Sequence, residues 1–212
     1  LYSGDFRRVG RKAVLVDQLM SAPPDDVDVL LLEGTTLGRT EAFPTEAELE
    51  EEFVALFRAT PGRVFVTWSA QNIDRTVTIY RACKRTNRTL VLDLYTVDVL
   101  ERLSALHGSL PRLGWPSVRV VVTSSMKRMY ESPDRMNAPA FVERCAQSGN
   151  AMGAAKLTGA GDSVVMLRPS LLRDFTSKGM SIETGDAWVF SMWSGYLKTP
   201  EYKDVRRAFE SA

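Results

Sequence analysis

Hydroxyl, amide and basic side chains recur where predicted strands of this sequence end. In a parallel α/β sheet, ligands bind outside the carboxyl ends of the strands, and such groups near helix N-termini suit the oxygens of phosphates. Each position taken alone predicts a helix cap, because serine and asparagine are preferred capping residues. Their recurrence is what predicts a phosphate or nucleic-acid groove. The residues are Ser69, Asn72 and Arg75 after the apolar run at 64–68, Ser124 and Lys127 after 118–123, and Arg168 and Ser170 after 163–167.

Two carboxylates stand where an acid could act in catalysis. Asp5 follows a glycine turn, and Glu33 ends the apolar run at 27–32. Spacing alone predicts a turn-closing role for Asp5 and a capping role for Glu33. The chain has a single histidine, His107, and two cysteines, whereas a catalytic zinc site takes three protein ligands, usually several of them histidines. The chain alone therefore does not supply a histidine-rich metal site.

The composition is that of a folded globular chain. Of 212 residues, 44% are hydrophobic and 25% are charged, which excludes a disordered, collagenous or disulfide-scaffold protein. Lysine and arginine number 27 against 26 acids, so a general attraction to nucleic acid is absent while a local basic groove stays open. No apolar run approaches the ~20 residues of a membrane span, so we expect no membrane partner. Two widely separated cysteines are typical of a cytoplasmic protein.

Apolar runs and helical patterns alternate from about residue 27 onward, which predicts βαβ units in an α/β fold. We expect a mostly parallel sheet flanked by helices. The first 26 residues do not follow this rhythm, and they predict an antiparallel hairpin with strands at 2–7 and 13–16. The glycine-rich phosphate motifs of nucleotide-binding folds are absent, which disfavours those folds. The expected strands are 27–32, 64–68, 89–94, 118–123, 163–167 and 188–191.

Three motifs in order resemble the metallo-β-lactamase-fold nucleases that carry a β-CASP domain, a family that includes ribonuclease J and the mRNA 3′-end endonuclease. The segment YSGDFR at Tyr2–Arg7 resembles the T-G-D-F-K/R segment of those enzymes. The segment LLLEGTTLG at Leu30–Gly38 resembles the acid-S-T-Y-G motif that opens the β-CASP domain. The segment VTWSAQNIDR at Val66–Arg75 resembles the T-F-S-x-N-x-x-R segment that follows it. The resemblance covers nearly the whole chain.

This resemblance implies a division of the chain and roles for individual residues. Residues 1–36 would be a fragment of the metallo-β-lactamase domain, contributing the hairpin, and residues 37–212 the β-CASP domain. Asp5 would bridge two metal ions, and Glu33 would support a catalytic histidine. In the intact parent the two ions would be zinc, which generate hydroxide and stabilise the leaving oxygen of a phosphodiester. The residues expected on the nucleic-acid side are Ser69, Asn72 and Arg75.

The chain departs from the family pattern in ways that shape the functional expectation. The family's H-x-H-x-D-H motif is not in the sequence, Gly34 stands where serine is usual, and Leu37 where tyrosine is usual. We expect the β-CASP portion of a zinc-dependent hydrolase, a ribonuclease or other nuclease, cut at both ends and inactive by itself. The alternative is a metal-free α/β module that binds nucleic acid or acts as a scaffold. Expected partners are RNA or DNA; a homodimer and the choice between endo- and exonucleolytic cleavage stay open.

Overall fold

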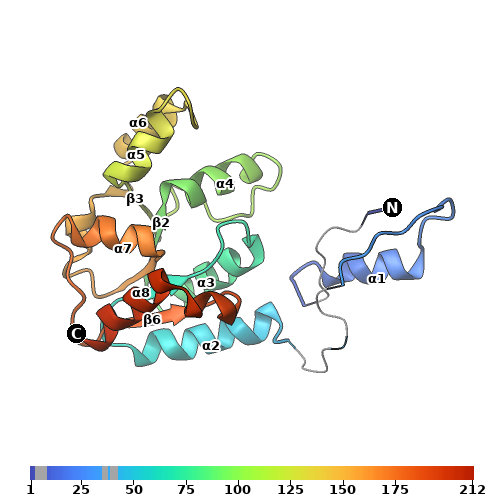
Figure 1. Cartoon of the computed structure of the whole chain (residues 1–212), viewed down its shortest axis with the longest axis horizontal. Coiled ribbons are helices and arrows are strands. Elements are labelled where there is room, and N and C mark those ends of the chain that lie inside the picture. The colour runs from blue at the N-terminus through green and yellow to red at the C-terminus, as the bar shows by residue number, and fades with distance from the viewer. Residues whose placement is uncertain (3–8, 35–37, 39–42) are drawn as a thin grey trace.

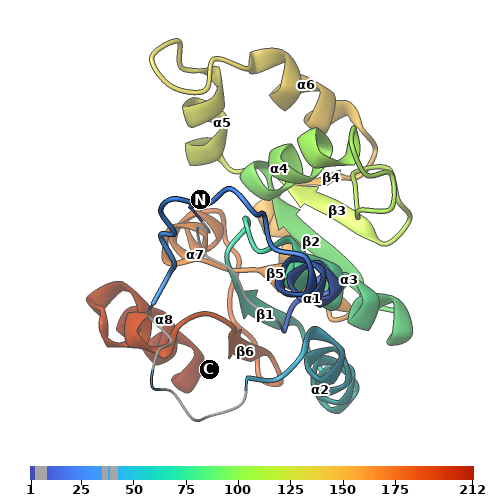
Figure 2. The same ribbon diagram turned by 90° about the vertical axis from the view of Figure 1, so that its right-hand side faces the viewer.

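A six-stranded parallel sheet forms the centre of the structure, a computed structural model that describes residues 1–2, 9–34, 38 and 43–212 (Figures 1 and 2). Its strand order is β4-β3-β2-β5-β1-β6, and every neighbouring pair is parallel. The carboxyl ends of all six strands therefore lie along one edge. The strands are β1 (Val64–Thr67), β2 (Thr89–Asp93), β3 (Val118–Val121), β4 (Ala151–Met152), β5 (Ser163–Met166) and β6 (Ala187–Phe190).

Helices cover both faces of this sheet, and each face has its own apolar cluster. Figure 2 shows α7 and α8 on one side of the strands and α2 and α3 on the other. The first face is covered by α2 (Glu46–Ala59), α3 (Ile73–Arg85), α4 (Leu94–Ser104), α5 (Ser124–Glu131) and α6 (Pro139–Gln147). The second is covered by the 3₁₀ helix η1 (Ala154–Leu157), α7 (Pro169–Thr176) and α8 (Pro200–Glu210), while the 3₁₀ helix η2 (Ser194–Lys198) precedes α8.

The predicted α/β class and parallel sheet are confirmed. The strands at 64–68, 89–94, 118–123, 163–167 and 188–191 form within one or two residues of their predicted bounds. These runs are apolar on both faces because helices cover both. The predicted helix after Pro44 also forms, with Thr45 and Glu48 in a reciprocal capping box, which satisfies two backbone N–H groups at its start. The short β4 and the helix α7 were not predicted.

The predicted strand at 13–16 is wrong, because these residues begin the helix α1 (Ala13–Ser21). Only the apolar run Ala13–Val16 indicated a strand. The residues that continue it, from Gln18 to Met20, are good helix formers, so the whole segment favours a helix. The first predicted strand of the hairpin falls mainly on residues 3–8, outside the described residues, and Tyr2 forms an isolated parallel bridge with Leu31.

The predicted buried strand at 27–32 is also wrong. Its large apolar side chains are exposed, and only Leu31 takes part in a bridge. The run lies along residues 1–2 instead of joining the sheet: the Leu31 N–H donates to Leu1 O at 2.9 Å, and the Leu1 amino group donates to Val29 O at 2.6 Å. A hydrophobic run favours burial but does not specify which strand it pairs with.

The N-terminal part is joined to the body of the structure through Arg11. Its guanidinium Nη2 contacts Glu50 Oε2 on α2 at 2.9 Å and Thr78 Oγ1 on α3 at 2.8 Å. Its backbone N–H donates to Asp74 Oδ2 at 3.1 Å. Among the described residues, no helix combines the length and the apolarity that crossing a membrane requires.

A buried ion pair fastens the amino-terminal side of the sheet. Arg63, directly before β1, and Asp186, directly before β6, have almost fully buried side chains. The Asp186 carboxylate accepts bonds from the Arg63 backbone N–H at 2.8 Å and from Nε at 3.1 Å, while Arg63 Nη1 donates to Leu157 O at 2.9 Å. Every charged group of the pair is therefore compensated, which a buried charge requires.

We expect Asp186→Ala to lower the free energy of unfolding by about 3–5 kcal/mol, because it leaves the Arg63 charge buried without its partner. Urea denaturation followed by circular dichroism measures this. The matched control is Asp204→Ala, which breaks the exposed pair with Arg207 and should cost less than about 1 kcal/mol. Equal losses in the two variants would contradict this account.

Candidate functional site

A crevice is expected at the carboxyl ends of β2 and β5. The two strands are neighbours in the sheet, but the helix after β2, α4, packs on one face and the helix after β5, α7, packs on the other. The chain therefore leaves this edge in opposite directions from adjacent strands. In open α/β sheets such a topological switch point is where ligands bind.

Asp93 and Arg168 meet at this switch point. Asp93 ends β2 and is completely buried, and its Oδ1 accepts the N–H of Thr96 at 2.8 Å, which caps α4. Its Oδ2 forms an ion pair with Nη2 of Arg168, the residue that precedes α7. The Arg168 side chain keeps 30% of its surface exposed, and its Nε is buried without a hydrogen-bond partner among the described residues. One part of this guanidinium is fixed by the protein and another part faces solvent.

An aromatic side chain lies near the Arg168 guanidinium. Its Cζ lies 5.9 Å from the centroid of the Tyr95 ring, and the Tyr95 hydroxyl accepts a bond from Gln71 Nε2 at 3.2 Å. Burial lowers the pKa of Arg168, and the interaction with Tyr202 on α8 opposes that change. Arginine remains protonated in proteins, so a positive charge stands at this edge of the sheet at neutral pH.

Most of the polar residues predicted from the sequence share this edge of the sheet, as parallel strands require. Ser69 follows β1 and is exposed, and Asn72 caps α3 by accepting the Arg75 N–H at 3.1 Å. Ser124 is the exposed first residue of α5, and Ser170 is exposed near the start of α7. Lys127 lies one turn further along α5, with Nζ 3.6 Å from Glu131 Oε1. Their role in nucleic-acid binding stays a prediction.

Arg75 lies at the same edge but is engaged by the protein itself. Its Nε and Nη2 each donate to the Glu46 carboxylate at 3.1 Å, and Nη1 donates to Ser191 Oγ. The side chain thus joins the start of α2 to the end of β6. Burial alone would raise the pKa of Glu46, but hydrogen bonds from Arg75 and Thr78 and the nearby positive charges hold it below its ordinary value.

The two acids that the resemblance singles out lie in the N-terminal part. Asp5 lies outside the described residues, and Glu33 is half-buried just after the exposed run at 27–32. Within the described ranges, no group of three or more histidine, cysteine, aspartate or glutamate side chains could hold a metal ion. The described side chains by themselves therefore do not supply the ligands for a pair of zinc ions.

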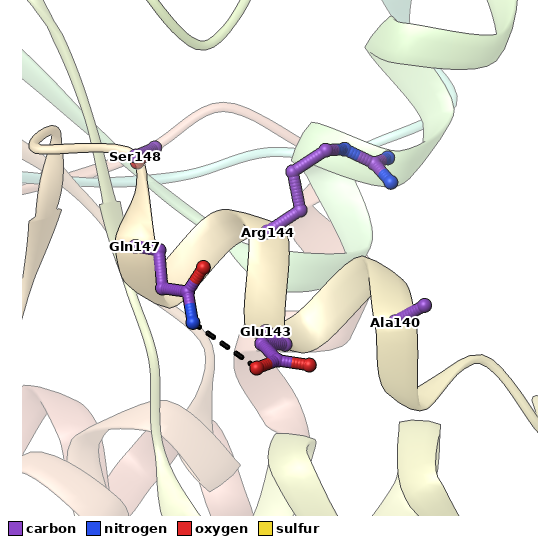
Figure 3. A pocket seen from close by; sticks show the side chains of 5 residues that line it. All are labelled: Ala140, Glu143, Arg144, Gln147 and Ser148. Atoms are coloured by element: carbon purple, nitrogen blue, oxygen red, sulfur yellow. Dashed lines mark hydrogen bonds between the residues drawn. The ribbon is translucent and has the colours of Figure 1, made fainter.

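A shallow hollow of about 410 Å³ lies over α6 and differs from the switch-point site (Figure 3). The Gln147 amide points toward Glu143 and donates to its Oε1 at 3.1 Å. Arg144 turns the other way and contacts Glu101 Oε2 at 2.8 Å. The charged groups of this hollow are thus paired within the protein, and none of the residues predicted from the sequence lines it.

Sequence reasoning missed Asp93 and Tyr95 as members of the site. The signal for Asp93 was present, since an acid directly follows the buried run Leu90–Leu92. Only the fold shows that Arg168, 75 positions later, pairs with it. No protein-family model matches the chain, and no curated protein matches it either.

We expect Glu46→Gln to lower the free energy of unfolding at pH 7 by about 1.5–3 kcal/mol, the usual contribution of hydrogen bonds to charged groups. A carboxyl group whose pKa is lowered by folding stabilises the fold above its unfolded pKa and loses that effect as pH falls through the folded pKa. The difference from wild type should therefore shrink as pH falls below the ordinary glutamate value of 4.5.

Urea denaturation at pH 7 and near pH 3 measures both the loss of stability at neutral pH and its decrease at low pH. The control is Glu52→Gln on the same helix, since Glu52 is exposed and has no hydrogen bond or ion pair within the described part of the chain. A difference between Glu46→Gln and wild type that does not change with pH would refute the assigned role of the Glu46 charge.

Proposed function

We propose that this chain is a nucleic-acid-binding α/β domain that resembles the β-CASP portion of metal-dependent nucleases. The observation that supports it most is Arg168 at the switch point, which forms an ion pair with Asp93 and keeps part of its side chain exposed to solvent. A guanidinium in this state suits a phosphate, because arginine presents several N–H donors in a planar fork that matches phosphate oxygens.

The extent of the polar edge favours a polymer over a single phosphate. Ser69, Arg168 and Ser124 follow β1, β5 and β3, and with β2 these strands are four successive members of the sheet. Neighbouring strands are roughly 4.8 Å apart, so the row spans about 14 Å. That length accommodates several phosphodiester units. The near-zero net charge is compatible with this function because the cations need only be local.

On the basis of the resemblance, we also propose that the intact parent cleaves phosphodiesters. There Asp5 would contribute to a two-zinc site and Glu33 would support a histidine. The alternative, a metal-free α/β module, shares the nucleic-acid-binding edge but not the hydrolysis. Zinc content therefore distinguishes the two: a zinc pair is expected in the parent of a nuclease and not in a metal-free module.

The double variant Arg168→Gln/Asp93→Asn tests the phosphate contact. It replaces the ion pair by two neutral amides, so no buried charge is left alone. We expect about tenfold weaker binding of single-stranded oligonucleotides near 0.1 M salt. The slope of log K against log salt concentration should fall in magnitude by about 0.7, the value for one phosphate contact on a single strand. Fluorescence anisotropy across a salt series measures both quantities.

The matched control is Lys84→Ala, which removes an exposed positive charge at the end of α3, on the opposite edge of the sheet. It should leave affinity within about twofold and the salt slope unchanged, since a distant exposed charge is screened. Equal effects of the two substitutions would argue against a localised site.

We expect this chain to bind labelled RNA or DNA without cleaving it when Zn²⁺ or Mn²⁺ is added, because a His-rich metal site is not encoded in it. Gel electrophoresis after prolonged incubation detects any product. Cleavage that Asp5→Asn abolishes would contradict this expectation, since the metal site would then be present in the chain. Cleavage that survives Asp5→Asn would indicate a contaminant.

A further inference from the structure

Two aromatic rings are exposed immediately after the edge strand β6. Trp193 keeps 65% of its surface accessible and Tyr196, in η2, 45%. Their ring centroids are 5.5 Å apart and their planes meet at 83°, an edge-to-face pair. Burial of large aromatic side chains lowers the free energy. An exposed pair in a structured segment is therefore a candidate contact surface.

The Trp193 ring lies directly over the backbone at Gly195. A Cβ built on Gly195 would lie 2.3–2.5 Å from three carbon atoms of the indole ring, so the ring covers the one position where glycine leaves room for it. Tyr196 supports it from the side. The ring therefore rests on the backbone at Gly195 and on a second ring while one of its faces stays accessible.

The pair lies on the same edge of the sheet as Arg168. Trp193 comes two residues after Ser191, whose N–H donates to Thr67 O at the carboxyl end of β1 at 2.8 Å. Tyr202 on α8 lies beside the end of β6 as well, with its ring 5.1 Å from Phe190. The aromatic pair therefore continues the phosphate-binding edge.

We propose that Trp193, supported by Tyr196, stacks on an unpaired base of a single-stranded nucleic acid whose backbone runs along this edge. The inference rests on the proposed function and specifies its substrate as single-stranded. Aromatic rings beside cationic groups are how proteins bind single strands without reading sequence. Lys198 in η2 adds an exposed charge with no ion pair in the described ranges. In a duplex the base faces are already stacked on one another and are closed to the indole.

Two oligomers with the same phosphates separate stacking from charge. One is an eight-nucleotide oligouridylate, and the other is an eight-unit abasic phosphodiester. For Trp193→Ala we expect about tenfold weaker binding of the oligouridylate, within the range for one stacked base, and less than a twofold change for the abasic oligomer. Trp193→Phe, which keeps a ring, should recover most of the affinity. Thermal unfolding of each variant verifies that it is folded.

Two further variants sharpen the test. Gly195→Ala forces the indole ring to move, and it should weaken oligouridylate binding in the same base-dependent way. Leu106→Ala removes an apolar side chain that is more exposed than Trp193 (77%) and lies just beyond the end of α4, on the opposite edge of the sheet. It should change neither affinity by more than twofold.

The outcomes separate this inference from the proposed function. If wild type binds neither oligomer, both are overturned. If wild type binds and Trp193→Ala has no effect, or weakens both oligomers equally, the stacking inference falls while nucleic-acid binding stands, and the rings belong to another contact such as a protein partner. A loss confined to the base-bearing oligomer supports the inference.

Discussion

The site depends on one constraint of the fold: neighbouring parallel strands end at the same edge while their connections leave on opposite faces. β2 and β5 are one such pair. β5 and β1 are another, because α3, the helix after β1, packs on the first face and α7 on the second. Because the two helices that follow the strands of each pair pack on opposite faces, neither lies between the strand ends. Side chains at the end of one strand can therefore reach those at the end of the next. Asp93 and Arg168 meet for this reason, and Arg168 compensates the buried charge of Asp93, which would be costly without a partner.

The ion pair does two things at once because only one partner is fully buried. Asp93 has no solvent contact and must keep both oxygens compensated, so it anchors the guanidinium firmly. Arg168 retains exposed surface, so its remaining donors can face a ligand. Because the guanidinium is already held by Asp93, less side-chain entropy is lost when a phosphate binds to it. A lysine would supply the charge without the planar fork that allows both contacts together.

Much of the fold could be predicted from the sequence, and the failures have physical causes. The central runs, such as Leu90–Leu92, are bounded by turn signals and are buried on both faces, so composition alone identifies them. The run at 27–32 has the same composition but no neighbouring strand in the sheet, and pairing depends on distant residues. Likewise Ala13–Val16 is apolar enough for a strand, while the helix-forming residues after it favour α1.

The candidate site was predictable as an edge but not as a set of contacts, and the two arginines show why. Arg75 and Arg168 both follow a strand near the start of a helix, so their sequence surroundings predict the same role. The two arginines differ in their tertiary partners. Arg75 donates from two nitrogens to Glu46, at the start of α2, and from the third to Ser191. Arg168 is held by one carboxylate, that of Asp93, and keeps 30% of its side-chain surface exposed. Availability for a ligand is therefore decided by the tertiary neighbour, which local spacing does not encode.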